Sequence, residues 1–206
     1  QISISLVLLV SSLLFVRSFR NLFTADAGFR QEGIVFSYIS YQHTVRSTDT
    51  AKPFRRDLLE RVRSLPGIES ASISTMMPLS NSRWTFAMQV PGTEGREFSQ
   101  FTWVSPQYFS TMGTPILAGR DISESDTPSS RPVIVVNETF VRRFLAGQNP
   151  LGRTVRTLAE PDYPEVVYEI VGVVKDSKYA DLREPVPPSA YGADMQHPLN
   201  DTWTIV

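Results

Sequence analysis

The sequence contains no cysteine, only two histidines and no surplus of charge of either sign. Without cysteine it forms no disulfide, no thiolate zinc site and no thiol nucleophile. The histidines, His43 and His197, make neither an HExxH motif nor a three-ligand zinc site, and we interpret them as solvated loop residues. Lysine plus arginine number 20 and aspartate plus glutamate 21, scattered along the chain. Because nucleic-acid-binding proteins present a basic face, we expect no nucleic-acid partner.

The sequence also lacks the phosphate-binding loops and nucleophile motifs of common enzymes. Neither the Walker pattern nor GxGxxG is present, so the chain is not itself an ATPase of that kind. No GxSxG elbow supports a Ser–His–Asp hydrolase. Asp121, Glu124 and Asp126 match no EF-hand spacing, and we interpret them as a solvated acidic loop that follows a turn at Arg120. We therefore expect no catalytic residue, no metal and no cofactor.

One long uncharged run is present, at the start of the chain. Ile2–Val16 is apolar except for serines, whose hydroxyls can bond to the backbone carbonyl one helical turn earlier. As a helix, this run is about 22 Å long, less than the roughly 30 Å hydrocarbon core of a bilayer. Because the sequence begins at Gln1 without methionine, we expect residues 1–23 to be a transmembrane helix truncated by the start of the fragment.

Two other interpretations of this run compete with a membrane helix. A signal peptide carries its basic residues before the apolar run, whereas Arg17 and Arg20 follow it here. A buried core helix has the same length and composition. The two arginines would by the positive-inside rule favour a cytoplasmic exit, so an extracytoplasmic domain requires stronger signals upstream.

The remainder of the chain alternates between strand and helix patterns. The segments 34–40, 52–65 and 68–74 predict a strand, an amphipathic helix and a strand, which together form a βαβ unit. Asn137 is expected to cap a helix over Glu138–Leu145, and Ser105 another short helix. Further strands are predicted at Trp84–Val90, Glu97–Val104, Ile116–Leu117, Val133–Val136 (central and buried), Arg153–Thr157, Val166–Val174, near Tyr191 (a short edge strand) and at Thr202–Val206.

Six aromatic residues cluster in the middle of the predicted sheet region. We expect them to build the core, although a hydrophobic ligand groove is a second possibility for the same set. They are Trp84, Phe86, Phe101, Trp103, Tyr108 and Phe109.

Seven ordered motifs resemble a known family. They are LVLLVSSLLFVRSFRNL, DAGF, LLERVRSLPGIESASIST, PLS, WVSPQYFSTMGTPILAGRDISESD, VIVVNETFVRRFLAGQNPLGRTV and YEIVGVVKDSKYADL. Together they look like the MacB-like periplasmic core domain of ABC transporter permeases, close to the duplicated permease group abundant in acidobacteria. The resemblance covers essentially the whole chain. Each motif alone is weak, and the ordered set is specific.

The resemblance implies an α+β fold in four parts. Residues 1–23 would be the truncated transmembrane helix, and residues 34–91 the first half of a porter-like subdomain built from βαβ units. Residues 97–191 would form an inserted mixed α/β subdomain, called Sabre-like, and residues 202–206 would begin the strand that returns to the porter-like subdomain.

The resemblance also implies a function and a location. The domain would lie on the periplasmic or extracellular side of the bacterial inner membrane and couple membrane-helix movement to export or efflux of a substrate by mechanotransmission. Implied partners are membrane lipid, an ABC ATPase subunit reached through the rest of the permease, a second permease in a dimer, and a periplasmic adaptor. Arg17, Arg20 and Phe23 are the candidate membrane-interface or coupling residues, and the helix-to-strand junction Arg17–Ile34 would be the coupling element. A membrane-anchored sensory or ligand-binding domain, and a secreted hydrolase, are the competing hypotheses.

Overall fold

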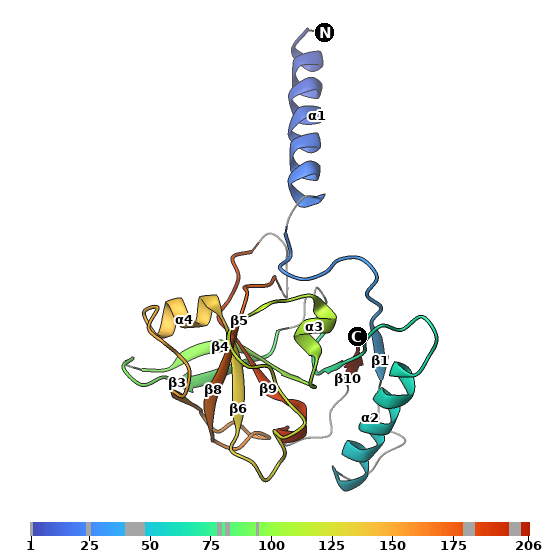
Figure 1. Cartoon of the computed structure of the whole chain (residues 1–206). Coiled ribbons are helices and arrows are strands. Elements are labelled where there is room, and N and C mark those ends of the chain that lie inside the picture. The colour runs from blue at the N-terminus through green and yellow to red at the C-terminus, as the bar shows by residue number, and fades with distance from the viewer. Residues whose placement is uncertain are drawn as a thin grey trace.

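The computed structural model describes residues 2–23, 26–39, 48–77, 80, 83–93, 95–178, 184–197 and 203–206. His43 lies outside these residues. The first element is helix α1 (Ile2–Phe23), which stands apart from a folded body (Figure 1). Its segment Ile2–Arg20 has a mean hydropathy of 2.1, and none of it is buried. The buried-core interpretation of this run is therefore wrong, and the helix is long and apolar enough to cross a membrane.

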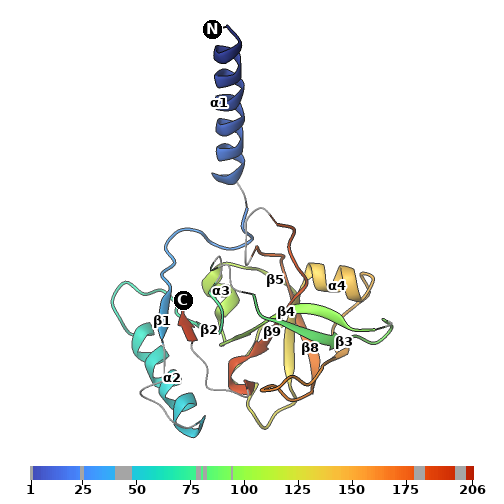
Figure 2. The same cartoon turned by 180° about the vertical axis from the view of Figure 1, so that it is seen from behind.

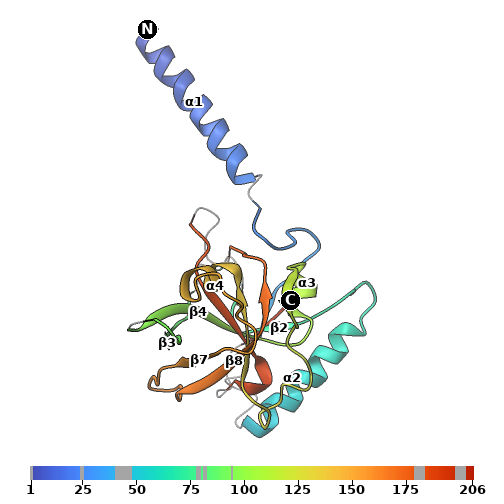
Figure 3. The ribbon, with the colours of Figure 1, turned by 60° about the vertical axis from the view of Figure 1, so that its left-hand side comes forward.

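Within the described residues, ten strands form one sheet, and six of them close into a ring. The ring order is β4-β3-β7-β8-β6-β9, with β9 pairing back to β4 in parallel. The bounds of the ring strands are β3 Thr85–Gln89, β4 Glu97–Val104, β6 Val133–Asn137, β7 Thr154–Thr157, β8 Val166–Val174 and β9 Ser189–Ala193. Strand β5 (Ile116–Gly119) pairs with β8 outside the ring. The ring appears as the compact barrel below α1 (Figure 3).

The rest of the sheet is a split βαβ unit beside this ring. Strand β1 (Ser37–Ile39) is followed by helix α2 (Thr48–Arg63) and strand β2 (Ile73–Ser74), which pairs with the end of β4. Strand β10 (Trp203–Ile205) lies between β1 and β2 and is antiparallel to both. The chain's last strand therefore joins its first two, and α2 lies beside them (Figure 2). The strands of this unit are shorter than predicted.

Two helix caps differ in how well the sequence predicted them. The Asn137 cap is confirmed, since its Oδ1 accepts the Phe140 amide of helix α4 (Glu138–Phe144) at 2.9 Å. The Ser105 cap is wrong. Helix α3 (Tyr108–Met112) begins later, and the buried Ser105 Oγ instead accepts the amide of Ile73 at 2.9 Å. Burial decides this outcome, because an unsatisfied buried amide at Ile73 would cost more than the lack of a side-chain cap at the start of α3.

Strand β9 corrects the prediction of an edge strand near Tyr191. All five residues of β9 are buried, and it pairs with both β4 and β6. Its small residues make room for neighbours, since a Cβ on Gly192 would lie 3.0 Å from the rings of Phe101 and Trp103. A short 3-10 helix, η1 (Asp194–Gln196), follows this strand.

The predicted aromatic core is confirmed except at one position. Phe86, Phe101, Trp103, Tyr108 and Phe109 are buried, whereas Trp84 is 42% exposed. Phe86, Phe101 and Trp103 pack together at ring-centroid distances of 4.6–5.7 Å.

His197 belongs to the same interior. It is 1% exposed, and its ring lies 4.3 Å from that of Trp103 and 5.3 Å from that of Trp203. The interpretation of His197 as a solvated loop residue is therefore wrong.

Candidate functional site: the junction between helix and body

A short linker connects α1 to the body and is held there along its length. It comprises Asp26–Arg30, beginning three positions after the end of α1. The Lys178 amide donates to the Ala27 carbonyl at 2.8 Å, and the Arg30 amide donates to the Met112 carbonyl at 2.7 Å. Ala27 is fully buried. The linker is thus bound to the loop after β8 on one side and to the end of α3 on the other.

Gly28 is the tightest point of this junction. Its φ of +79° favours glycine, and a Cβ there would lie 2.2 Å from the Asp176 carbonyl oxygen and 2.7 Å from the Ser177 Cα. Its carbonyl also accepts the Thr114 hydroxyl at 3.3 Å. Gly28 lies five positions after Phe23, the last residue of α1, so its left-handed conformation belongs to the linker and not to the end of that helix.

A carboxylate fixes the entry to the junction. Asp26 Oδ1 accepts the Gly28 amide at 2.8 Å, and Lys175 Nζ donates to Asp26 Oδ2 at 3.0 Å. The pKa of the Asp26 carboxyl is lowered below its ordinary value, mainly by the hydrogen bond from the Gly28 amide and secondly by Lys175. Because these groups favour the ionised form, the linker carries a charge that Lys175 partly balances at neutral pH.

The junction continues into helix α4 through Asp176. Its carboxylate accepts the Thr139 amide at 2.9 Å and the Thr139 hydroxyl at 2.7 Å. Its own amide donates to Glu138 Oε2 at 3.0 Å. Asp176 therefore joins the segment that contacts the linker to the first turn of α4.

The candidate residues predicted on α1 lie on the helix itself, before the linker in the chain. Arg17 and Arg20 are exposed and, being three positions apart, lie on the same side of the helix. Phe23 is the last residue of α1, and its side chain is outside the described part of the chain. The predicted coupling segment Arg17–Ile34 contains Asp26 and Gly28, although neither was singled out, and sequence reasoning missed Asp176 altogether. The DAGF motif was the only local sequence feature that pointed to this junction.

The predicted acidic loop is a closed structure rather than a cation site. Arg120 donates to both carboxylate oxygens of Asp126 at 2.8 Å each, which lowers the pKa of Asp126 despite its burial. Asp121 Oδ1 accepts the Ile122 amide, and burial raises the pKa of Asp121 to about 6. The interpretation of this loop as solvated is therefore wrong for Asp126, which is 5% exposed. No cluster of three potential metal ligands occurs among the residues that the structure describes.

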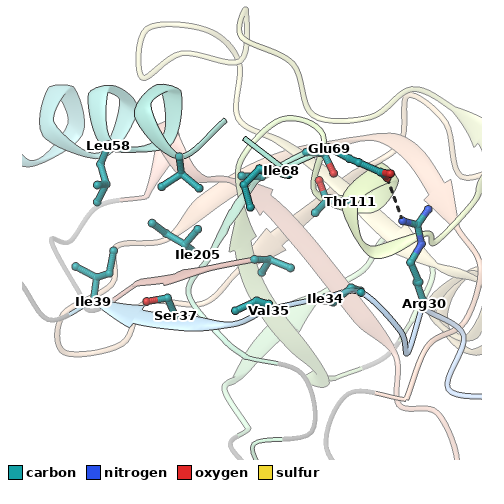
Figure 4. Close-up of a pocket in the computed structure, with 16 residues that line it drawn as sticks. Arg30, Ile34, Val35, Ser37, Ile39, Leu58, Ile68, Glu69, Thr111 and Ile205 are labelled. Atoms are coloured by element: carbon teal, nitrogen blue, oxygen red, sulfur yellow. Dashed lines mark ion pairs between the residues drawn. The ribbon is translucent and has the colours of Figure 1, made fainter. Parts of the chain in front are cut away.

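A second candidate site is an apolar groove of about 620 Å³ between α2 and strands β1 and β10. Leu58 projects from α2 toward Ile39 and Ile205, and Arg30 and Glu69 form an ion pair at 3.9 Å at one end (Figure 4). The aromatic residues considered for a ligand groove are not part of it.

Comparison with known proteins identifies the class of this fold and then its family. The fold is that of extracytoplasmic domains of ABC-type transporters. The family model described as "MacB-like periplasmic core domain" matches residues 2–196, so the chain belongs to this family. It is therefore a MacB-like periplasmic domain of an ABC-type permease.

Individual relatives agree with the family. "Macrolide export ATP-binding/permease protein MacB" of Aggregatibacter actinomycetemcomitans is 32% identical over 75 residues, which are 36% of this chain and 11% of that protein. The crystal structure of the periplasmic region of MacB from Actinobacillus actinomycetemcomitans has a TM-score of 0.52 at 18% identity and covers 73% of this chain and 63% of that one. The extracellular domain of the noncanonic ABC-type transporter YknZ from Gram-positive bacteria has a TM-score of 0.51 at 12% identity, over 83% and 81% of the two chains.

Proposed function

We propose that this domain transmits movement between the membrane helix α1 and an extracytoplasmic body during export or efflux by an ABC permease. The docked linker is the observation that carries the proposal. A flexible tether would leave α1 and the body to move independently, whereas Gly28 lies against the Asp176 backbone and Asp176 is bonded to α4. Movement of the helix would then reach the body as rigid-body motion.

The proposal assigns the domain a mechanical rather than a catalytic role. An ABC ATPase on another part of the permease or on a separate subunit would supply the energy, and a permease dimer with a periplasmic adaptor would receive the motion. We keep the division into a porter-like unit and an inserted subdomain as part of the proposal, with the split βαβ unit as the porter-like part and the six-stranded ring as the inserted one. Strand β3 then belongs to the ring, although the residues 34–91 assigned to the porter-like half include it. In this view Arg17 and Arg20 hold the depth of α1, since long basic side chains reach lipid headgroups from within a helix.

The location of the body is the part of this proposal that an experiment can decide first. These 206 residues contain no cysteine, so once any cysteine elsewhere in the full permease is replaced, a single Ser129→Cys substitution on an exposed loop gives a unique label site. In intact cells expressing the full permease, a membrane-impermeant maleimide should label this cysteine when it has access to the periplasm. Labelling only after the inner membrane is opened would place the body in the cytoplasm and contradict the proposal.

The apolar groove favours one other function, the binding of an apolar ligand by a membrane-anchored domain. Leu58, Ile39 and Ile205 offer an apolar lining of a size that such ligands occupy. Leu58→Glu would abolish ligand binding there without touching the junction. If Leu58→Glu changes transport but the junction variants described below do not, the ligand-binding function replaces the mechanical one.

A further inference from the structure

Helix α2, which lies along the side of the body (Figure 3), carries one basic residue near each end of its inward face. Lys52, Leu59 and Arg63 follow one another at intervals of seven and four positions, so they lie on one side of the helix. Leu59, between the two basic residues, is buried in the core that α2 shares with the ring. The two basic residues are about 16 Å apart along the helix axis. They are called the α2 clamp here.

The first clamp residue fastens the beginning of α2 to the segment after β9. Lys52 Nζ donates to the Met195 carbonyl at 2.8 Å. Met195 belongs to η1, which is itself bound to the ring. Gln196 Oε1 accepts the Val133 amide of β6 at 3.0 Å, and Gln196 Nε2 donates to the Arg131 carbonyl at 3.0 Å. Because a charged donor makes a stronger hydrogen bond than a neutral one, Lys52 holds this end of α2 to a segment fixed on the ring.

The second clamp residue fastens the end of α2 to the segment after β4. Arg63 Nε donates to the Ala71 carbonyl at 2.9 Å, within the βαβ unit, and Arg63 Nη2 donates to the Pro106 carbonyl at 3.4 Å. Pro106 lies between β4 and α3, outside the βαβ unit. A guanidinium offers several donors in one plane, so a single side chain can bridge two segments. Arg63 thus joins the βαβ unit to the ring at the opposite end of α2 from Lys52.

The other contacts between the βαβ unit and the ring hold the two parts together without fixing the direction of α2. Strand β2 joins β4 by main-chain hydrogen bonds over residues 73–75. The apolar core that both parts share is stabilised by the hydrophobic effect, which is non-directional. Hydrogen bonds depend on angle as well as distance. Two such bonds at opposite ends of one helix therefore restrict its rotation as well as its position.

We infer that the α2 clamp fixes α2 across the side of the ring, so that the βαβ unit and the ring move as one rigid body. Without it, α2 would turn about the short β2–β4 pairing in the manner of a hinge. The inference goes beyond the proposed function, because it concerns the body alone and holds whether or not α1 crosses a membrane. Combined with that function, it means that movement received at the linker is carried by the ring and α2 together.

A distance distribution between α2 and the ring tests the clamp. Spin labels are placed at Glu60→Cys, an exposed position on α2, and at Thr154→Cys, an exposed position on β7. The protein is the full permease in nanodiscs, with any cysteine outside these 206 residues replaced and an excess of unlabelled permease added, so that only distances within one chain contribute. Pulsed electron paramagnetic resonance should give a single narrow distribution, and a broad one would overturn the inference.

Two double variants make the test specific to the clamp. Lys52→Met with Arg63→Met removes both clamp bonds and should at least double the width of the distribution. The matched control, Arg56→Met with Arg61→Met, removes the same charge from two exposed residues of the same helix, each of which pairs with a carboxylate four positions away on α2. It should keep the narrow distribution. Because Glu60 is substituted in every variant, the loss of its pair with Arg56 is common to all of them.

The outcomes decide the inference even if one variant folds poorly. A clamp variant as narrow as the unsubstituted protein, or a control as broad as the clamp variant, would overturn it. If the double clamp variant is poorly folded, Lys52→Met alone takes its place, since Lys52 is only partly buried. This single variant should also broaden the distribution, and an unchanged width would overturn the inference.

Discussion

The α-carbon of Gly28 lies so close to the carbonyl of Asp176 that a methyl group there would lie 2.2 Å from the oxygen. This approach joins the segment after α1 to the loop after β8. It also explains why the residue is glycine, since both the positive φ and the short distance exclude a side chain.

Replacing Gly28 by alanine should detach the linker from the body. The new methyl group meets backbone on a loop tied to α4, so the linker rather than the body is expected to move. Amide exchange at Lys178 and Arg30 should accelerate at least about tenfold, which corresponds to about 1.4 kcal/mol. The matched control is Gly33→Ala. Its φ is +72°, but nothing lies within 4 Å of its added Cβ, so it carries backbone strain alone. Equal exchange rates in the two variants would contradict a tight junction.

Arg55 should be far more important to stability than its neighbour Arg56. The guanidinium of Arg55 is buried 4.1 Å from the ring centre of Trp203, and it contributes a favourable charge near the buried Asp194. We expect Arg55→Met to lower the free energy of unfolding by about 3 kcal/mol, since it removes one charge from a buried set. Arg56→Met removes only an exposed pair with Glu60 and should cost about 0.5 kcal/mol or less. Denaturant unfolding in detergent measures both, and equal losses would contradict the role given to Arg55.

Asp194 should make the protein less stable as the pH rises from about 4 to about 6. Burial raises its pKa from 3.8 to about 6, so the folded state holds a proton that the unfolded state has released. Above pH 6 the cost is complete, about 3 kcal/mol for a shift of this size. Asp194→Asn should therefore reduce the slope of unfolding free energy in this range.

The slope should be reduced rather than lost, because Asp121 has a raised pKa of about 6 and acts in the same direction. Asp26 and Asp126 have lowered pKa values, so their contributions fall away only below pH 4. An Asp194→Asn variant with an unchanged slope would show that the carboxyl is not buried in the native state.

Asn137 should be a stronger cap than its place on a short helix implies. Its Oδ1 accepts the amides of both Phe140 and Ser189 at 2.9 Å, and its Nδ2 donates to the Pro187 carbonyl. It thus joins α4 to the start of β9 in the interior. Asn137→Ala should cost about 2 kcal/mol or more, at the upper end for a cap, because buried amides lose their acceptor. The exposed turn residue Asn149, which bonds only Leu151, is the control, and an equal loss for Asn149→Ala would contradict this assignment.

Much of the fold could be predicted from local pattern. The strands β4, β6 and β8 were predicted within one or two residues, because long or continuous apolar patterns define them. Strand β9 was misjudged because its sequence SAYGA lacks the β-branched residues typical of a central strand. Its small residues leave room for the aromatic rings that pack beside them, and this packing is visible only in the fold.

The sequence predicted the region of the junction but not its contacts. The segment between Arg17 and Ile34 was expected to couple helix and body, and the structure places the contacts at Asp26–Arg30. Their partners, Met112 and the segment 175–178, are more than 80 positions away in the sequence, and no local pattern joins them. The ion pair of Arg120 with Asp126 was missed for a different reason. From the sequence alone, a polar loop is interpreted as solvated, because the burial of the Asp126 carboxylate is visible only in the structure.

Rigid connection of α1 to the body is the central claim, and a distance distribution measures it directly. Spin labels at Ser11→Cys in α1 and Ser129→Cys in the body of the full permease in nanodiscs, with any cysteine outside these 206 residues replaced, report the spread of separations by pulsed electron paramagnetic resonance. The account predicts a single narrow distribution that broadens in Gly28→Ala and stays narrow in Gly33→Ala. A broad distribution in the unsubstituted protein, or one that Gly28→Ala leaves unchanged, would contradict it.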